Sequence, residues 1–221
     1  MYPLALNICR RLCVVIGGGK VAERKVRGIL AASGRVRLVS PAVTPDLAAL
    51  ADAQAIEWLC KPYSREDLDG AFLVFAATDD AGAQQAVHRD AQAAGLLVNI
   101  ADDPEWCDFQ VPATIRRGDL SISVATSGKS PAVAAMVKRR LEQLVGEEYG
   151  WLTALAALLR EQILAGEPDS ERTRMLFQQL LHDDIADWLK DRRWHDIRLH
   201  VEHVLGRPVH FDPESLTREN P

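Results

Sequence analysis

The sequence has no apolar run that approaches the ~18 residues of a membrane-spanning helix. It does not indicate a secretory signal peptide either. We therefore expect a cytoplasmic protein that has no membrane partner.

Cysteine pairs with the spacing of a metal site or a redox motif are also missing. The four cysteines, Cys9, Cys13, Cys60 and Cys107, do not form the CxxC pattern of such sites. We predict free thiols and no metal site. Cys9 and Cys13 bracket the start of the first predicted strand, where a small buried hydrophobe serves packing.

An excess of positive charge is absent as well. The net charge is −5, from 26 Lys and Arg against 31 Asp and Glu. Nucleic acid is therefore not expected as the main partner, although local basic clusters suit an anionic small molecule. A chain of 221 residues is long enough for one larger domain and an appendage.

What the sequence does have, close to its start, is an apolar strand that runs into three glycines. Residues 14–25 read VVIGGGKVAERK, which fits the dinucleotide pattern G-x-G-x-x-G/A. Gly17 permits the tight turn, Gly19 lets the backbone approach a pyrophosphate, and Ala22 lets the next helix pack on the strand. Free amides at the start of that helix then face the anion. The predicted cofactor-binding turn comprises Gly17, Gly18, Gly19, Lys20, Val21 and Ala22.

A glycine turn that binds nothing is the structural alternative, and the surrounding pattern favours the nucleotide. Apolar residues recur at helical spacing over 20–33, and Gly34 stands where a C-cap glycine is expected. A second strand follows at 36–40. Strand, turn, helix and strand thus occur in the order that the nucleotide motif requires.

The usual ribose-binding residue is missing from this motif. In NAD sites an Asp or Glu roughly 20 residues beyond the glycines bonds the ribose hydroxyls. Here the second strand ends with Ser40, Pro41 and Ala42, so no carboxylate is available, and no Arg or Lys stands there to hold a 2′-phosphate. We favour NAD as the cofactor, with Ser40 as the ribose partner.

The first half of the chain alternates predicted strands and helices. A strand of four or five residues that ends before Gly17 and strands at 36–40, 55–59, 71–77 and 96–100 alternate with helical segments. We therefore predict an α/β fold with a Rossmann-type, doubly wound parallel sheet. Beyond Pro112 the pattern changes to a strand pair and then to helices near 132–145, 147–165, 170–190 and 193–205, with no periodic pattern after Gly206. The expected domains are an NAD-binding domain at 1–112, a dimerisation segment at 113–148 and a helical domain at 149–221.

An acidic tract follows the fifth predicted strand. Residues 99–113 read NIADDPEWCDFQVPA and contain Asp102, Asp103, Glu105 and Asp108. One interpretation is a turn-forming loop that caps the sheet. The other is catalytic, because hydride loss from a ring carbon leaves a cation that must shed a proton to a base.

A second polar tract, residues 126–130 (TSGKS), precedes a predicted helix that begins with Pro131. Ser130 suits an N-cap, with proline in the first helical position. Hydroxyls, exposed amides and Lys129 at a helix start also suit a bound carboxylate. A cap and an anion site use the same groups, so both interpretations stay open. His200 and His203 share a helix face without a third metal ligand, and we expect them to face solvent.

Several motifs together resemble the siroheme synthase precorrin-2 dehydrogenase family. They are Tyr2-Pro3-Leu4, VVIGGGKVAERKV, FAATDD, VNIADDPEWCDF, the proline of QVPA, and SGKSP followed by a basic helix. They occur in one order through about the first 145 residues, and the helical remainder agrees in length and character.

The resemblance implies a homodimeric enzyme that oxidises precorrin-2 to sirohydrochlorin with NAD. Some members also insert ferrous iron to make siroheme. Asp102 takes the place of the family's catalytic aspartate, and Asp103 is the second candidate. Thr78 and Asp79 of FAATDD join the cofactor site.

The resemblance also implies where the substrate binds. The segment Thr126–Gly128 matches the family's segment near the substrate and the dimer interface, where many members carry a glycine in place of Ser127. Cations are needed for the eight carboxylates of precorrin-2. The predicted substrate-binding residues are Thr126, Ser127, Lys129, Ser130 and Arg116, and further cations stand at Arg117, Arg139 and Arg140.

Two other classes of protein would use parts of this sequence. A non-catalytic NAD-sensing regulatory domain needs the glycine turn, and an interaction protein needs only the dimer segment. Neither requires the acidic tract.

Overall fold

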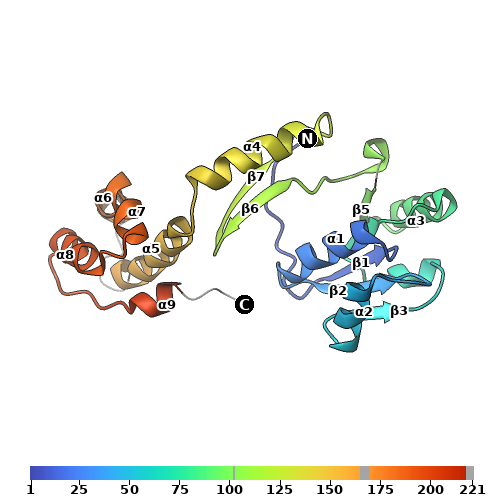
Figure 1. The fold of residues 1–221 in the computed structure, drawn as a ribbon, viewed down its shortest axis with the longest axis horizontal. Helices are drawn as coiled ribbons and strands as arrows, with labels where there is room; N and C mark the ends of the chain where they lie inside the picture. The colour runs from blue at the N-terminus through green and yellow to red at the C-terminus, as the bar shows by residue number, and fades with distance from the viewer. Residues whose placement is uncertain (102, 165–169, 218–221) are drawn as a thin grey trace. The chain divides into compact units, whose positions relative to one another are not determined.

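The computed structural model describes residues 1–101, 103–164 and 170–217. The chain forms two compact units, Met1–Val111 and Pro112–Pro221 (Figure 1). Within the described residues, no helix has the length and apolar character needed to cross a membrane. The finer division of the second unit at residue 148 stays a prediction.

The first unit contains the predicted parallel sheet. Its strand order is β3-β2-β1-β4-β5, with every neighbouring pair parallel, and the predicted doubly wound sheet is confirmed. In the register of the sheet, Val14 of the central strand β1 is paired with Arg37 of β2 on one side and with Val74 of β4 on the other. The strands are β1 (Leu12–Ile16), β2 (Arg35–Val39), β3 (Glu57–Leu59), β4 (Leu73–Ala76) and β5 (Leu97–Ile100).

Helices cover both faces of this sheet. One face packs on α1 (Lys20–Leu30) and α2 (Pro45–Asp52), and the other packs on α3 (Ala81–Ala93) and the short turn η1 (Arg65–Leu68). Burial on both sides explains why the strands are continuous apolar runs rather than alternating ones. The carboxyl edge of the sheet is the place that such a fold leaves for a ligand.

The end of α1 differs from the prediction. The helix ends at Leu30, and the left-handed residue is Ser33 (φ 56°), not Gly34. The amides of Ser33 and Gly34 donate to the carbonyls of Leu30 (2.8 Å) and Ile29 (3.0 Å), which is the Schellman pattern. A Cβ on Gly34 would lie 2.7 Å from Cγ2 of Ile29, so glycine is required here for space rather than for a positive φ.

The second unit begins with an antiparallel hairpin, β6 (Ala113–Arg117) and β7 (Leu120–Val124). The turn of the hairpin rests on the start of a helix, because a Cβ on Gly150 would lie 2.7 Å from the backbone of Arg117. Helices follow to the end of the described chain. They are α4 (Pro131–Leu144), α5 (Glu148–Leu164), α6 (Ser170–Leu180), α7 (Asp183–Lys190), α8 (Trp194–Leu205) and α9 (Pro213–Thr217).

One prediction for this unit is wrong. The single helix over 170–190 is two helices, which are separated at His182, the extended N-cap residue of α7. On one continuous helix Leu180 and Ile185 would point about 140° apart, and the break lets both be fully buried. The tail also contains α9, whose first turn is capped by Asp212 and whose Leu216 is buried.

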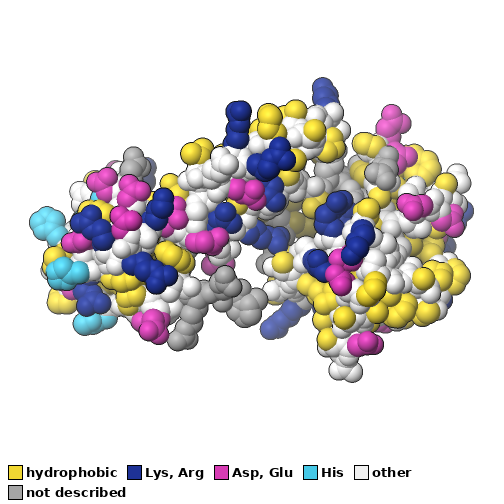
Figure 2. Space-filling model, in the orientation of Figure 1, with side chains coloured by type: hydrophobic (Ala, Val, Ile, Leu, Met, Phe, Trp, Pro, Cys, Tyr) yellow, Lys and Arg dark blue, Asp and Glu magenta, His cyan; other side chains and the backbone are white. Residues whose placement is uncertain are grey.

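His200 does not face solvent as we expected. Its ring lies against those of His182 and Trp188, with centroid distances of 4.6 and 5.9 Å, because α8 packs on α6 and α7 at this point. Among the described side chains, its Nε2 is buried without a hydrogen-bond partner. His203 is exposed, as expected. Figure 2 shows histidines gathered on the surface of the second unit.

We expect this helical unit to lose stability as the pH falls from about 7 to about 5. Burial, and then the nearby His182, lower the pKa of His200 below its ordinary 6.5. The unfolded chain therefore binds more protons in this window than the folded chain, and the free energy of unfolding falls with pH. Thermal unfolding across this range measures the slope. His200→Gln should flatten it, whereas His203→Gln should not, and equal slopes in all three proteins would contradict the assignment.

Candidate nucleotide-binding site and acidic loop

The glycine turn closes tightly against its neighbours. Gly17 has φ 114°, and a Cβ there would lie 2.1 Å from the carbonyl oxygen of Ala77. A Cβ on Gly18 would lie 1.9 Å from the carbonyl oxygen of Ala42, in the loop after β2. Only glycine fits these two positions.

Gly19 is different, because a Cβ there would have no described atom within 4 Å. It is the N-cap of α1, in extended backbone. Open space in front of a helix start is where an anion meets free amides and the positive end of the helix dipole. Ala22 is fully buried under the helix, so its small side chain sets the packing of α1 on the sheet.

A buried carboxylate braces this turn, and it was missed from the sequence. Glu23 is 5% exposed and pairs with Lys20 at 3.0 Å and with Arg27 at 3.1 Å. It also accepts a hydrogen bond from Thr44 at 2.9 Å, and the amide of Thr44 donates to Gly18 at 2.9 Å. The hydrogen bonds from Lys20 and Thr44 lower the pKa of Glu23. The i, i+3 and i, i+4 spacing to Lys20 and Arg27 was the only sequence signal.

A cavity of about 300 Å³ lies at the carboxyl edge of the sheet, beside the glycine turn. Three predicted cofactor residues, Gly17, Ser40 and Thr78, line it, whereas Asp79 is not among its described lining residues. The full lining comprises Ile16, Gly17, Val39, Ser40, Pro41, Pro62, Tyr63, Thr78, Asp80, Ala83 and Ala86. Tyr63 carried no motif that pointed to this site, whereas Asp80 is the last residue of FAATDD, next to the predicted Asp79.

The side chain of Ser40 is already engaged. Its hydroxyl donates to the carbonyl of Ala42 at 2.7 Å, and the residue is 7% exposed. A ribose hydroxyl would therefore meet the lone pairs of Ser40 rather than its proton.

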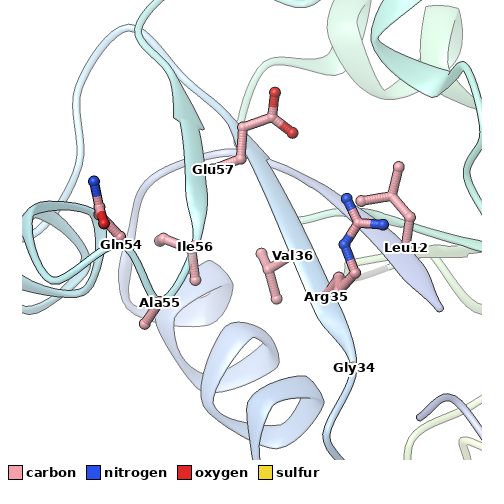
Figure 3. Close-up of a pocket in the computed structure, with 8 residues that line it drawn as sticks. All are labelled: Leu12, Gly34, Arg35, Val36, Gln54, Ala55, Ile56 and Glu57. Atoms are coloured by element: carbon pink, nitrogen blue, oxygen red, sulfur yellow. The ribbon is translucent and has the colours of Figure 1, made fainter. Parts of the chain in front are cut away.

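A second cavity, of about 390 Å³, opens at the opposite edge of the same sheet (Figure 3). Val36 and Ile56 form its apolar part, and Gln54, Arg35 and Glu57 stand around it. These residues stand at the amino ends of β2 and β3, whereas ligands of doubly wound sheets bind at the carboxyl ends. The cavity at the glycine turn is therefore the candidate nucleotide site.

The described carboxylates of the acidic loop after β5 make different contacts. Asp103 caps the short turn η2 (Pro104–Trp106) and accepts from the amides of Glu105 and Trp106 at 3.1 and 3.3 Å. Asp108 accepts from the amide of Val98 at 2.9 Å and so fastens the far end of the loop to β5. The exposed Glu105 lies between them. Asp102, the predicted catalytic residue, lies outside the described residues.

Cys107 holds the base of the same loop. Its sulfur accepts from the amide of Ile100 at 3.2 Å and lies 3.1 Å from the carbonyl oxygen of Asp103. Burial raises the pKa of this thiol. Of the other thiols, Cys13 is buried, whereas Cys9 and Cys60 are exposed. The expected buried position is therefore correct for Cys13 and wrong for Cys9.

A partly buried lysine connects α1 to the segment after the loop. Lys25 Nζ donates to Asn99 Oδ1 at 2.8 Å, and Asn99 Nδ2 donates to the carbonyl of Phe109 at 2.9 Å. Burial lowers the pKa of Lys25. Sequence reasoning missed this pair, because the two residues are 74 positions apart.

In the second unit, the polar tract before α4 forms a closed turn. Ser127 and Gly128 both have positive φ, 53° and 78°. Thr126 Oγ1 accepts from the amide of Ser130, whose own Oγ accepts from the amide of Val133, both at 3.2 Å. The cap interpretation of Ser130 is thus present in the structure. The left-handed backbone of Ser127 is a conformation that glycine adopts without strain.

The cations of this unit are only partly paired. Arg117 Nε lies 3.3 Å from Glu147 and donates to the carbonyl of Val145 at 3.1 Å. Arg116, Lys129, Arg139 and Arg140 are exposed. Within the described part of the chain, no group of three or more His, Cys, Asp or Glu side chains is placed to hold a metal ion.

The sheet order, the glycine turn and the cavity beside it define a Rossmann-type nucleotide-binding unit. A family model described as "Putative NAD(P)-binding" matches residues 4–113, and one described as "Sirohaem biosynthesis protein central" matches residues 117–144. The chain belongs to the siroheme synthase N-terminal, precorrin-2 dehydrogenase family, as its motifs predict.

Named relatives agree with this assignment. Siroheme synthase of Chromobacterium violaceum is 38% identical over 186 residues, which cover 84% of this chain and 40% of the relative. Siroheme synthase of Thioalkalivibrio sulfidiphilus is 36% identical over 204 residues, which cover 92% of this chain and 42% of the relative. The chain thus spans about two-fifths of the length of these relatives.

A solved structure supports the fold. The protein "SirC, precorrin-2 dehydrogenase" superimposes with a TM-score of 0.76 at 24% sequence identity, over 93% of this chain and 100% of that chain.

Proposed function

We propose that this chain oxidises precorrin-2 to sirohydrochlorin with NAD as the hydride acceptor. The observation that carries the proposal is the glycine turn, where Gly17 and Gly18 are forced by packing and Gly19 alone opens to free space at a helix start. Gly17–Ala22 would hold the pyrophosphate, Thr78 and Ser40 would meet the adenosine side, and Asp79 is retained as a neighbouring candidate.

The nicotinamide supplies a hydride acceptor when bound. The chain must then take up the proton that leaves the substrate ring, and we assign that step to Asp102 in the acidic loop. Asp103 is the second candidate, although its carboxylate already accepts hydrogen bonds from two backbone amides as the cap of η2.

Substrate carboxylates require positive charge and hydrogen-bond donors. We assign this role to Arg116, Lys129, Thr126, Ser127 and Ser130. Exposed cations bind carboxylates without a prior partner to displace.

Mixing the protein with NAD and precorrin-2 and following nicotinamide absorbance tests the proposal. NADH formation at a rate proportional to protein concentration supports it. An NAD-sensing regulatory domain would bind NAD in calorimetry and form no NADH, and that result would overturn the enzyme assignment.

We propose ferrous iron insertion into sirohydrochlorin as a second activity, because some members of the family carry out this reaction. Two ring protons must leave as the metal enters, so a carboxylate could serve both steps. The ring supplies four nitrogens, and a protein metal cluster is not needed. The assay compares siroheme formation from sirohydrochlorin and ferrous iron with the protein-free rate, and no acceleration would leave the dehydrogenase alone.

We expect NAD to be used at least about tenfold more efficiently than NADP, a difference of about 1.4 kcal/mol. The loop after Ser40 carries no cation for a 2′-phosphate, and the nearby Lys61 already pairs with Asp67 at 2.6 Å. The values of kcat/KM with both cofactors measure this. Ala42→Arg, at an exposed position of the loop, should reduce the difference in kcat/KM between NAD and NADP. Equal values of kcat/KM in the unaltered protein would show that another side chain binds the 2′-phosphate.

We also expect a homodimer that uses the β6–β7 hairpin and α4. Val133, Met136 and Leu144 of α4 are 46, 42 and 71% exposed, a large apolar surface for one helix. In the alternative to a dimer, the hairpin packs under the later helices of its own chain. Part of the hairpin does so, because α5 contacts both β6 and β7. Light scattering at micromolar concentration measures the mass. Met136→Glu should shift the protein toward monomer, and a monomeric starting protein would contradict the expectation.

A further inference from the structure

One wall of the cavity beside the glycine turn is an aromatic ring with a fixed orientation. Tyr63 follows β3, packs against the α3 side of the sheet and lines the cavity next to Pro41 and Pro62. Its hydroxyl donates to Asp90 Oδ2 of α3 at 3.2 Å. The ring is therefore held at both ends, by packing and by a hydrogen bond.

Asp90 is a firm anchor for that bond. The residue is 8% exposed, and its other oxygen lies 3.1 Å from Nε of Arg89. A buried carboxylate needs such partners to remain charged. Burial and then the charge of Asp90 raise the pKa of Tyr63, so the phenol keeps the proton that it donates.

The cavity fits one half of a dinucleotide. Its volume of about 300 Å³ is at the small end of ligand pockets, which run from roughly 300 to 1,000 Å³. Its lining comes from the ends of β1 and β2, from the loop after β3 and from the start of α3.

The half that enters is the adenosine half. No described residue of the acidic loop lines the cavity. The reacting nicotinamide has to reach that loop if its carboxylate takes the proton. With the pyrophosphate at Gly19, the adenosine is left to extend toward Pro41 and Tyr63.

We infer that Tyr63, positioned by Asp90, is the surface on which the adenine ring of the cofactor stacks. This inference rests on the proposed use of NAD. A planar base gains from a flat aromatic partner of fixed orientation, and stacking on an aromatic side chain is worth ~1–3 kcal/mol per base when tested by truncation. Pro41 and Pro62 extend the apolar wall without adding a charge.

The test measures binding of NAD, AMP and nicotinamide mononucleotide by calorimetry. Tyr63→Leu, which fills the site without a ring, should weaken NAD and AMP by about tenfold. Tyr63→Phe keeps the ring and should stay within about threefold of the unaltered protein. Nicotinamide mononucleotide has no adenine, so its affinity should be the same in all proteins. Tyr2→Ala, at an 87% exposed tyrosine, is the matched control.

Turnover provides a second readout. Tyr63→Leu should raise KM for NAD and leave kcat unchanged, which a general loss of structure would not do. Unchanged NAD and AMP affinity in Tyr63→Leu would overturn the inference and leave the proposed function intact. Equal losses in Tyr63→Phe and Tyr63→Leu would overturn stacking in favour of the hydroxyl. If the unaltered protein binds AMP through Tyr63 but forms no NADH from precorrin-2, the proposed function fails while the adenosine site stands.

Discussion

Asp102→Asn is expected to lower the rate of precorrin-2 oxidation by about 10²-fold or more, with NAD affinity unchanged. Asparagine keeps the size of the side chain and removes the basic lone pair that would accept the substrate proton. Single-turnover NADH formation at saturating NAD measures the chemical step, and calorimetry measures the affinity.

Neighbouring carboxylates provide the controls. Glu105→Gln removes the same charge from an exposed position in the same loop and should leave the rate near that of the unaltered protein. Asp103→Asn keeps a side chain that can cap η2, because asparagine and aspartate are comparable N-caps, so a change in rate would report on chemistry rather than on the cap. Near-normal turnover in Asp102→Asn combined with a collapse in Asp103→Asn would transfer the base to Asp103. If iron insertion is also lost in Asp102→Asn, one carboxylate serves both reactions.

Gly19→Asp is expected to abolish NAD binding while the protein still folds. A Cβ at this position meets no described atom within 4 Å, so the fold has room for the side chain. The carboxylate would occupy and repel the place of the pyrophosphate. Calorimetry should detect no NAD binding, and the thermal midpoint should stay within a few degrees of the unaltered protein.

Gly28→Asp is the matched control for that experiment. Gly28 lies on the same helix and also has open space at its Cβ position, but it stands away from the glycine turn. NAD should bind this variant normally. Unchanged NAD affinity in Gly19→Asp would refute the placement of the pyrophosphate.

The architecture of the first unit was predictable because its signals are local. Apolar runs of strand length, glycines at their ends and helical spacing between them specify the alternation of strands and helices. The local pattern failed to predict helix ends that are determined by tertiary contacts. Gly34 was predicted as a left-handed cap, but contact with Ile29 selects it, and Ser33 takes the positive φ. The break before α7 likewise follows from burial of Leu180 and Ile185 on one core, which no short window contains.

The candidate site shows the same division. The glycine turn is a contiguous motif, and its residues could be named from the sequence. Glu23, Lys25 and Tyr63 have partners 21, 74 and 27 positions away, which a single sequence does not reveal. Only the helical spacing of Glu23 to Lys20 and Arg27 could be read from the sequence. The acidic tract could be located from the sequence, but its structural carboxylates could not be distinguished from its catalytic candidates. Asp108, for example, has a structural role because it accepts a hydrogen bond from the amide of Val98 in β5.

The thiol at the base of the acidic loop makes local opening of that loop measurable as a chemical rate. Cys107 should react with an alkylating reagent more slowly while its contacts to Ile100 and Asp103 are intact, because the reactive species is an accessible thiolate. The exposed Cys9 and Cys60 supply the unprotected rate in the same molecule, and the buried Cys13 reports global unfolding. Mass spectrometry of the labelled peptides therefore yields a free energy of opening for the loop, separate from that of the core. Adding NAD or substrate would then show how strongly each ligand holds the loop closed.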